Sequence, residues 1–327
     1  MKITRREFGK KALSSAIGLS ACFSFPSFLF LSPRKSPVVI ARSDKLKRVN
    51  HQLIKENAAP FLDRALVKIT GQSSAAAAWK SLFSPAEKIG IKLSCLPGQP
   101  LSSGYGLVMA IVDGLTAAGV KKKNIFIWER TNRELQRAGF TLSRSGVRVV
   151  GTDTYYGDGY SDSIEFAGSV GTRFSLIMEA VDALINVPVL KDHDLSGVSI
   201  SMKNFYGAIY NPNKFHRNNC DPYIAELNTH PIIKDKLRLI VCDASRVQVN
   251  NGPAFFPRYA WEYGGILVSQ DPVALDYIGW QIIEKRRKEL GLKSLKAVDR
   301  EPRYIATAAK LKLGNIDERY IDKINIQ

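Results

Sequence analysis

The stretch Ala183–Gly207, ALINVPVLKDHDLSGVSISMKNFYG, decides the predicted fold and suggests where a ligand binds. Its first eight residues are almost all apolar, which is typical of a buried strand. The polar run KDHD (191–194) follows at once, and the pair Lys203-Asn204 comes twelve positions after Lys191. Polar side chains directly beyond a buried strand are the usual geometry of a ligand site in α/β proteins. We therefore expect an anion or a metal ion to bind here.

Strand and helix patterns alternate on both sides of this stretch. We expect further strands over residues 89–93, 125–128, 147–150, 237–241 and 264–268, and helices over 107–118, 134–138, 174–180, 222–227, 273–290 and 304–312. Residues 89–128 form a strand–helix–strand unit, which implies a parallel pair with a right-handed crossover. Residues 155–171 are rich in Gly, Tyr, Ser and Asp and are predicted to be a surface loop. The pattern predicts an α/β fold, with a mostly parallel sheet and flanking helices.

Three segments are expected along the chain. Residues 1–31 have the composition of an export signal or membrane anchor. Residues 32–86 are predicted to be a linker that enters a short strand at Val38–Ile40, followed by an N-terminal helical segment over 50–70 and 75–83. Residues 87–327 are predicted to be the α/β domain.

Ionisable residues stand at the ends of the predicted strands. Ligands of open α/β sheets bind beyond the carboxyl ends of the strands, so we expect these side chains to converge on one crevice. They are Lys92, Glu129, Lys191, Asp243 and Asp271. In this hypothesis an anion is held by Lys191, Lys203 and Lys92, with Asn204 and Asp276 nearby. His193 would be a general acid/base or a metal ligand, and Asp243 or Asp271 would orient it.

Asp271 has a second interpretation. It precedes Pro272 at the start of the predicted helix 273–290, and an Asp in that position caps a helix N-terminus. Asp276 follows five residues later and lies on a different face of the helix. The catalytic and the capping role of Asp271 both remain open at this point.

A metal site is a further hypothesis. His216 and Cys220 have a spacing that suits metal ligands on a helix, although the segment NPNKFHRNNCDP is full of helix breakers. Together with His193 they could bind zinc or iron. Besides Cys22 the chain has Cys95, Cys220 and Cys242, with no Cys-x-x-Cys pair. This number predicts no iron–sulfur motif and at most one disulfide.

A glycine-containing loop, SSGYG (102–106), precedes the predicted helix 107–118 and could cradle an anion at the helix N-terminus. It lacks the third glycine of a dinucleotide fingerprint. The sequence contains no Walker motif, no Gly-x-Ser-x-Gly and no His-Glu-x-x-His. The recognised motifs therefore identify no reaction.

The net charge of +17 favours anionic partners such as lipid headgroups or acidic metabolites, although it could also be a solvated basic surface. Residues 1–31 contribute +4 of this charge and the remainder +13. No basic stripe with interleaved aromatic residues is present, so we expect no nucleic-acid partner.

The motif Thr4–Lys10, TRREFGK, resembles a twin-arginine export signal and places Arg5 and Arg6 at its invariant pair. The resemblance implies the twin-arginine (Tat) export machinery as a partner, and a route that carries folded, often cofactor-loaded proteins. The uncharged segment Ala12–Leu31 follows, and its twenty residues are enough to span a bilayer.

The fate of this signal has three alternatives. Leu19–Cys22 resembles a lipobox, in which Cys22 would be lipidated, but the residues after it remain apolar. An uncleaved helix would also anchor the chain, and release is the third alternative, although no Ala-x-Ala site is present. We expect the protein in the periplasm or tethered to the outer face of the inner membrane.

Several motifs together resemble domain-of-unknown-function family 362 (DUF362). They are IGIKLS, NIFIWER, VPVLKDH, SMKNFYG, NNCDP, RLIVCDA, NNGP and SQDPVALD, and the resemblance extends roughly over Pro37–Gly314. The family's characteristic polar positions fall on Lys92, Lys191, His193, Lys203, Asn204, Asp271 and Asp276. The family has no settled activity. Some members carry ferredoxin-like cysteine clusters, which suggests redox chemistry, but this chain has none.

Two functions fit these observations. The first is an exported enzyme that acts on a small anionic substrate and has a possible metal or redox link. The second is a tethered binding or assembly partner of a redox system, which would use the same crevice without turnover.

Overall fold

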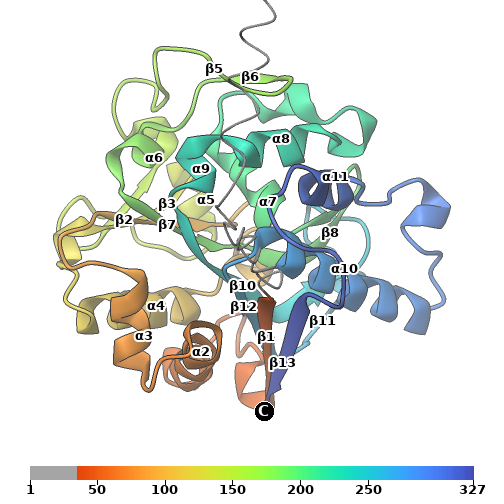
Figure 1. Ribbon diagram of the computed structural model, residues 1–327, viewed down its shortest axis with the longest axis horizontal. Coiled ribbons are helices and arrows are strands. Elements are labelled where there is room, and N and C mark those ends of the chain that lie inside the picture. Colours follow the sequence, from red (N-terminus) through yellow and green to blue (C-terminus); the bar gives the residue numbers. More distant parts are fainter. Residues whose placement is uncertain (1–34) are drawn as a thin grey trace, which may run out of the picture. The chain divides into compact units, whose positions relative to one another are not determined.

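A sheet of eleven strands organises residues 35–327, the part of the chain that the computed structural model describes (Figure 1). The strands are β1 (Ser36–Arg42), β2 (Ile89–Leu93), β3 (Ile125–Glu129), β4 (Arg148–Gly151), β7 (Ala183–Val187), β8 (Val189–His193), β9 (Gly197–Ser199), β10 (Leu237–Gln248), β11 (Ala260–Trp261), β12 (Gly265–Ser269) and β13 (Ile321–Ile326). Along its main path the order is β13-β1-β12-β10-β7-β2-β3-β4, and β8, β9 and β11 attach beside β10.

The sheet is mostly parallel, as the sequence predicts. Strands β4, β3, β2, β7 and β10 run in one direction, and β8 continues β7 along β10. The antiparallel pairs are β12 with both β10 and β1, and the short strands β9 with β8 and β11 with β10. The carboxyl ends of β2, β3 and β8 therefore lie at one edge of the sheet, whereas the carboxyl end of β12 points the opposite way.

Helices cover both faces, because the central strands are apolar on both faces. On one face Ile91, Ile185 and Val241 pack against α2 (Lys55–Thr70), α3 (Ala75–Leu82) and α4 (Tyr105–Ala117). On the other face Leu184 and Ile240 pack against a second core. That core is built on α6 (Leu176–Ala180), α7 (Ser201–Asn204), α8 (Tyr223–Thr229), α9 (Pro231–Lys234), α10 (Pro272–Glu289) and α11 (Tyr304–Lys310). Figure 1 shows α2, α3 and α4 grouped together, apart from α10 and α11.

Three expectations about the elements are corrected. The segment 155–171 is not only a loop, because it contains part of a hairpin of β5 (Glu165–Ala167) and β6 (Val170–Thr172), whose turn has Gly168 at φ +58°. Strand β8 continues through His193, and β10 continues to Gln248, so Lys191 and Asp243 lie inside strands rather than beyond them. The helix expected from residue 50 begins at Lys55, since Asn50 and His51 adopt positive φ.

The N-terminal region belongs to the same compact unit as the sheet. Strand β1 lies between β12 and β13, and α2 packs beside α4, so residues 35–86 are not separate from the α/β domain. Within residues 35–327 no helix has the length and apolar character needed to cross a membrane. The predicted export signal, with Arg5, Arg6 and Cys22, lies outside the described residues.

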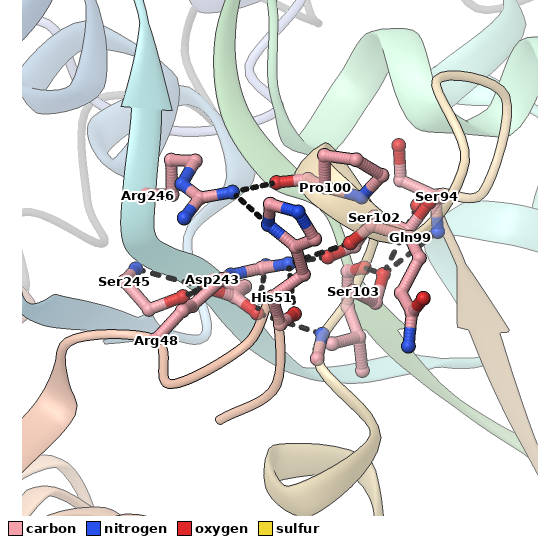
Figure 2. A network of polar contacts seen from close by, with 12 residues as sticks. Arg48, His51, Ser94, Gln99, Pro100, Ser102, Ser103, Asp243, Ser245 and Arg246 are labelled. Atoms are coloured by element: carbon pink, nitrogen blue, oxygen red, sulfur yellow. Dashed lines mark hydrogen bonds and ion pairs between the residues drawn. The ribbon is translucent and has the colours of Figure 1, made fainter. Parts of the chain in front are cut away.

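A buried network connects this N-terminal region to the sheet (Figure 2). Asp243 accepts hydrogen bonds from Arg48 Nη2 at 2.9 Å and from the Gly104 backbone at 2.7 Å, and Arg48 also donates to the Ser102 carbonyl. The loop SSGYG is therefore held by internal hydrogen bonds, which include Ser103 Oγ to the Val187 carbonyl at 2.6 Å. It is not an open anion cradle.

Breaking this network tests how the N-terminal region is held. Asp243→Ala leaves the Arg48 guanidinium buried without its carboxylate, and we expect a loss of about 3–5 kcal/mol in the free energy of unfolding. Urea denaturation followed by circular dichroism measures this change. Asp44→Asn removes an exposed pair with Lys47 and serves as the control, with no measurable change expected. Equal stability of the two variants would contradict the assignment.

Candidate functional site

A cavity of about 210 Å³ opens at the carboxyl ends of the parallel strands. The predicted site residues Lys191, His193, Lys203, Asn204 and His216 all line it. Twelve further residues complete the wall: Ser94, Cys95, Leu96, Glu129, Arg130, Glu134, Ser199, Tyr206, Gly207, Pro212, Asn213 and Pro253. The structure thus gathers residues from β3, β8, α7 and the loops after them at one place.

Lys191 enters the cavity from β8, where it pairs in register with Ser199 of β9. Its side chain is buried, and no other residue in the range 35–327 forms a hydrogen bond or ion pair with its Nζ. Burial lowers the pKa of Lys191 to about 8, although the nearby carboxylates of Glu129 and Asp192 favour the charged form. The Lys191 amine is therefore mostly protonated at pH 7, and its ammonium group has no carboxylate at ion-pair distance.

Lys203 enters from α7 and is also buried. Its Nζ lies 3.1 Å from His216 Nε2 and 3.8 Å from the centroid of the Tyr206 ring. Burial lowers the pKa of Lys203 to about 7, and the nearby Lys191 also lowers it. The cation–π contact with Tyr206 favours the ammonium form. No carboxylate of the described chain is close enough to form an ion pair with it. Lys203 is thus poised to gain or lose a proton near neutral pH.

The two histidines of the cavity stack on each other, with ring centroids 5.8 Å apart. Burial lowers the pKa of both His193 and His216 to about 4, so both rings are neutral at pH 7. His193 Nδ1 lies 3.0 Å from Asp194 Oδ1. The same nitrogen accepts the backbone N–H groups of Leu195 at 3.2 Å and Ser196 at 3.4 Å, which requires a lone pair rather than a proton on Nδ1. These contacts ask opposite roles of Nδ1, so they do not assign the tautomer of His193.

Glu129 is, with Glu134, one of two glutamates in the cavity wall, and Lys92 lies behind it. Lys92 Nζ donates to Glu129 Oε1 at 2.6 Å and to the Leu93 carbonyl at 2.7 Å. A Cβ at position 207 would lie 2.7 Å from Lys92 Nζ and 2.9 Å from Glu129 Oε1, so Gly207 lets the chain pass close to this pair. Lys92 is not among the residues that line the cavity, so its charge acts through Glu129.

Asp276 positions α7 rather than lining the cavity. Its carboxylate accepts the backbone N–H groups of Ser201 at 2.7 Å and Met202 at 3.2 Å, and the Tyr304 hydroxyl lies at 3.3 Å. These contacts fix the start of the short helix that carries Lys203. Burial raises the pKa of Asp276 to about 7.

The prediction that Asp271 joins this crevice is wrong. Because β12 is antiparallel to β10, its carboxyl end lies beside the amino-terminal half of β10, where Ser269 pairs with Ile240. Asp271 caps α10 by accepting the N–H groups of Val273 and Ala274. Asp243 is likewise occupied by its hydrogen bonds to Arg48 and Ser245 and does not face the cavity.

The predicted metal ligands do not assemble. Residues 35–327 contain no group of three His, Cys, Asp or Glu side chains arranged to hold a metal ion. His216 Nε2 is engaged by Lys203, and Cys220 is buried outside the cavity lining. Cys95, Cys220 and Cys242 are all free thiols, so no disulfide forms among them.

Several lining residues were not predicted as ligand contacts. Arg130 and Glu134 form an ion pair at the cavity wall with an N–O distance of 2.5 Å, and Tyr206 supplies the aromatic face beside Lys203. Position alone could have suggested Arg130, since it follows the strand that ends at Glu129. Nothing in the local pattern distinguishes Tyr206 from a core residue.

The fold and this cavity define an α/β protein with a lysine-rich pocket at the ends of its parallel strands. The family model described as "Domain of unknown function (DUF362)" matches residues 90–281, a range that contains every residue lining the cavity. The chain belongs to this family. No curated protein matches the chain.

The positioning role of Asp276 can be tested with a nearly isosteric change. Asp276→Asn turns an amide NH₂ toward one of two backbone donors, so we expect a loss of about 1–3 kcal/mol in the free energy of unfolding. Release of α7 should also make Lys203 more reactive toward an acylating reagent at pH 9, which peptide mapping detects. Asp235→Asn, at an exposed position, is the control. Unchanged stability and Lys203 labelling would show that Asp276 does not hold the helix.

Proposed function

We propose that the cavity binds a small organic anion and that the protein is an enzyme acting on it. One observation carries this proposal. Lys191 and Lys203 are buried at the same cavity, and within residues 35–327 neither has a carboxylate partner at ion-pair distance. A buried ammonium without a counterion is costly, so a bound anion would supply the missing charge.

The acids of the cavity wall do not serve as counterions for Lys191 and Lys203. Glu129 is paired with Lys92 and Glu134 with Arg130, so each carboxylate already has its own cation. The two remaining lysines give the cavity a surplus of positive charge. A carboxylate or phosphate group between them would form short, charge-assisted hydrogen bonds in a partly desolvated site.

The neutral histidines favour an enzyme over a binding or assembly partner without turnover. Binding an anion requires the lysines alone, and protonated histidines would strengthen it. His193 and His216 are instead held neutral by burial, which suits groups that accept and return a proton at pH 7. Four groups with shifted pKa values around one cavity are typical of active sites.

We further propose that the protein is exported by the Tat machinery and stays at the membrane or in the periplasm. Support comes from the sequence TRREFGK with its arginine pair and from the uncharged segment that follows. Lipidation at Cys22 or an uncleaved helix would provide the tether, so the membrane is a proposed partner.

Removing either lysine charge should weaken anion binding. We expect calorimetry with small carboxylates and phosphate monoesters to find at least one ligand whose affinity falls about 10–100-fold in Lys191→Met and in Lys203→Met, the loss typical of a charged hydrogen bond. Lys121→Met, at an exposed position, should bind like the wild type. If the two cavity variants bound the same anion as tightly as this control, the proposal would fail.

Anion binding should also depend on pH. The anion binds the ammonium forms and raises the lysine pKa values above about 7 for Lys203 and about 8 for Lys191, so protons are taken up on binding. We expect the affinity to be greatest below pH 7 and to fall as the pH rises toward 10, provided that the ligand itself stays ionised. Affinity that is constant or rises over this range would contradict the assignment.

The export proposal has a simple test. Replacing Arg5 and Arg6 by lysines keeps the charge of the segment but removes the arginine pair that the export machinery recognises. We expect the variant to remain in the cytoplasm of the host cell, as measured by fractionation and immunoblotting. Export of the double-lysine variant at the wild-type level would argue against this route.

A further inference from the structure

We propose that Lys203 is a nucleophile that forms an imine with a small 2-oxo acid whose carboxylate is held by Lys191. This inference rests on the proposed anion pocket and assigns different roles to its two lysines. The geometry that separates them is the contact of Lys203 with His216, for which Lys191 has no equivalent among residues 35–327.

The tautomer of His216 follows from its contacts. Nδ1 lies 3.0 Å from the Pro212 carbonyl oxygen, which can only accept, so Nδ1 carries the proton. Nε2 therefore has its lone pair directed at Lys203 Nζ, 3.1 Å away. An N–H of Lys203 donates to this ring, and the ring can receive the proton that the nitrogen loses when it forms a bond to carbon.

The surroundings of Lys203 favour the free amine, which is the nucleophilic form. It is buried and lies near a second cation, Lys191, which disfavours its own charge. Desolvation and a neighbouring cation are the two known ways to activate a lysine for imine formation. Lys191 has the higher pKa of the two and keeps its proton at pH 7, as an anion-binding group must.

The reaction balances without an oxidant or a reductant. The Lys203 nitrogen attacks the carbonyl carbon, a C–N bond forms, and the electron pair of the C=O π bond moves to the oxygen. His216 takes one proton from the nitrogen and delivers it to that oxygen, which gives a carbinolamine and a neutral ring. His216 then takes the second proton of the nitrogen and gives it to the hydroxyl, which leaves as water while the nitrogen lone pair completes the C=N bond. An imidazole whose pKa is near 4 is a strong acid once protonated, which suits the departure of water.

The size of the cavity limits the substrate. A volume of about 210 Å³ suits a small organic acid. Glyoxylate and pyruvate are of this size, and in this proposal their carboxylate lies at Lys191 and their carbonyl at Lys203.

Reductive trapping tests the proposal on the full chain. The protein is incubated with glyoxylate or pyruvate and cyanoborohydride at pH 7, and the adduct is located by intact mass measurement and peptide mapping. We expect one adduct per chain on Lys203, no adduct with acetate or lactate, and no site-specific adduct in Lys203→Arg or Lys203→Met. Lys191→Met should need about 10-fold more oxo acid for the same rate, and His216→Asn should react more slowly at saturation.

The outcomes separate this inference from the proposed function. The assignment of Lys203 as the nucleophile would be refuted if the wild-type protein formed no adduct or formed it on Lys191. It would also be refuted if the adducts were spread over exposed lysines to the same extent as in Lys203→Met. If calorimetry still found pyruvate or another anion bound through Lys191, the proposed anion pocket would be supported without an imine at Lys203. If no anion bound and no lysine were trapped, the anion pocket and the imine would both be refuted. Melting curves of the two Lys203 variants control for misfolding, and two well-folded variants that still form the adduct would also refute the assignment.

Discussion

The structure depends on how charge is buried at the carboxyl ends of its parallel strands. Burying a charge is tolerated when a partner is close. Among residues 35–327, two ion pairs have both side chains buried. Lys92 pairs with Glu129 across β2 and β3, and Arg48 pairs with Asp243 beneath the N-terminal region. Lys191 and Lys203 are buried without such a partner in the described chain, and the proposed anion site follows from that difference.

The surrounding network explains why these lysines stay in place. Asp276 accepts the first backbone N–H groups of α7, so the helix that carries Lys203 is anchored to α10. Gly207 allows the next residues to pass over the Lys92–Glu129 pair. Asp276 and Gly207 therefore position the segments that surround the cavity. The reactive groups themselves are those of Lys191, Lys203, His193 and His216.

Much of this arrangement could be predicted from the sequence. The apolar runs of β2, β3 and β7 and the polar residues after them predicted a mostly parallel sheet, and they suggested the polar group that lines the cavity. These signals are local, since they depend on a few consecutive residues. The predicted strand boundaries were least accurate where β8 buries charged residues, because polarity is normally the sign that a strand has ended.

The remaining features depend on contacts between distant residues. Asp271 was misplaced because the direction of β12 follows from its pairing with β10 and β1, which a strand pattern does not reveal. The pairing of Asp243 with Arg48 joins residues nearly two hundred positions apart. The predicted metal site failed for a similar reason, because Lys203 reaches the histidine nitrogen that a metal ion would have needed.

Titration of Lys191 and Lys203 themselves would show whether the cavity holds ammonium groups without a counterion. Competitive acylation over a range of pH, read out by peptide mapping, reports the pKa of each amine in the folded protein. We expect Lys203 to titrate with a pKa near 7 and Lys191 with a pKa near 8, and a bound anion to raise both values. If both lysines titrated together with the exposed lysines, the cavity would hold no ammonium groups that lack a counterion, and the proposed anion site would be wrong.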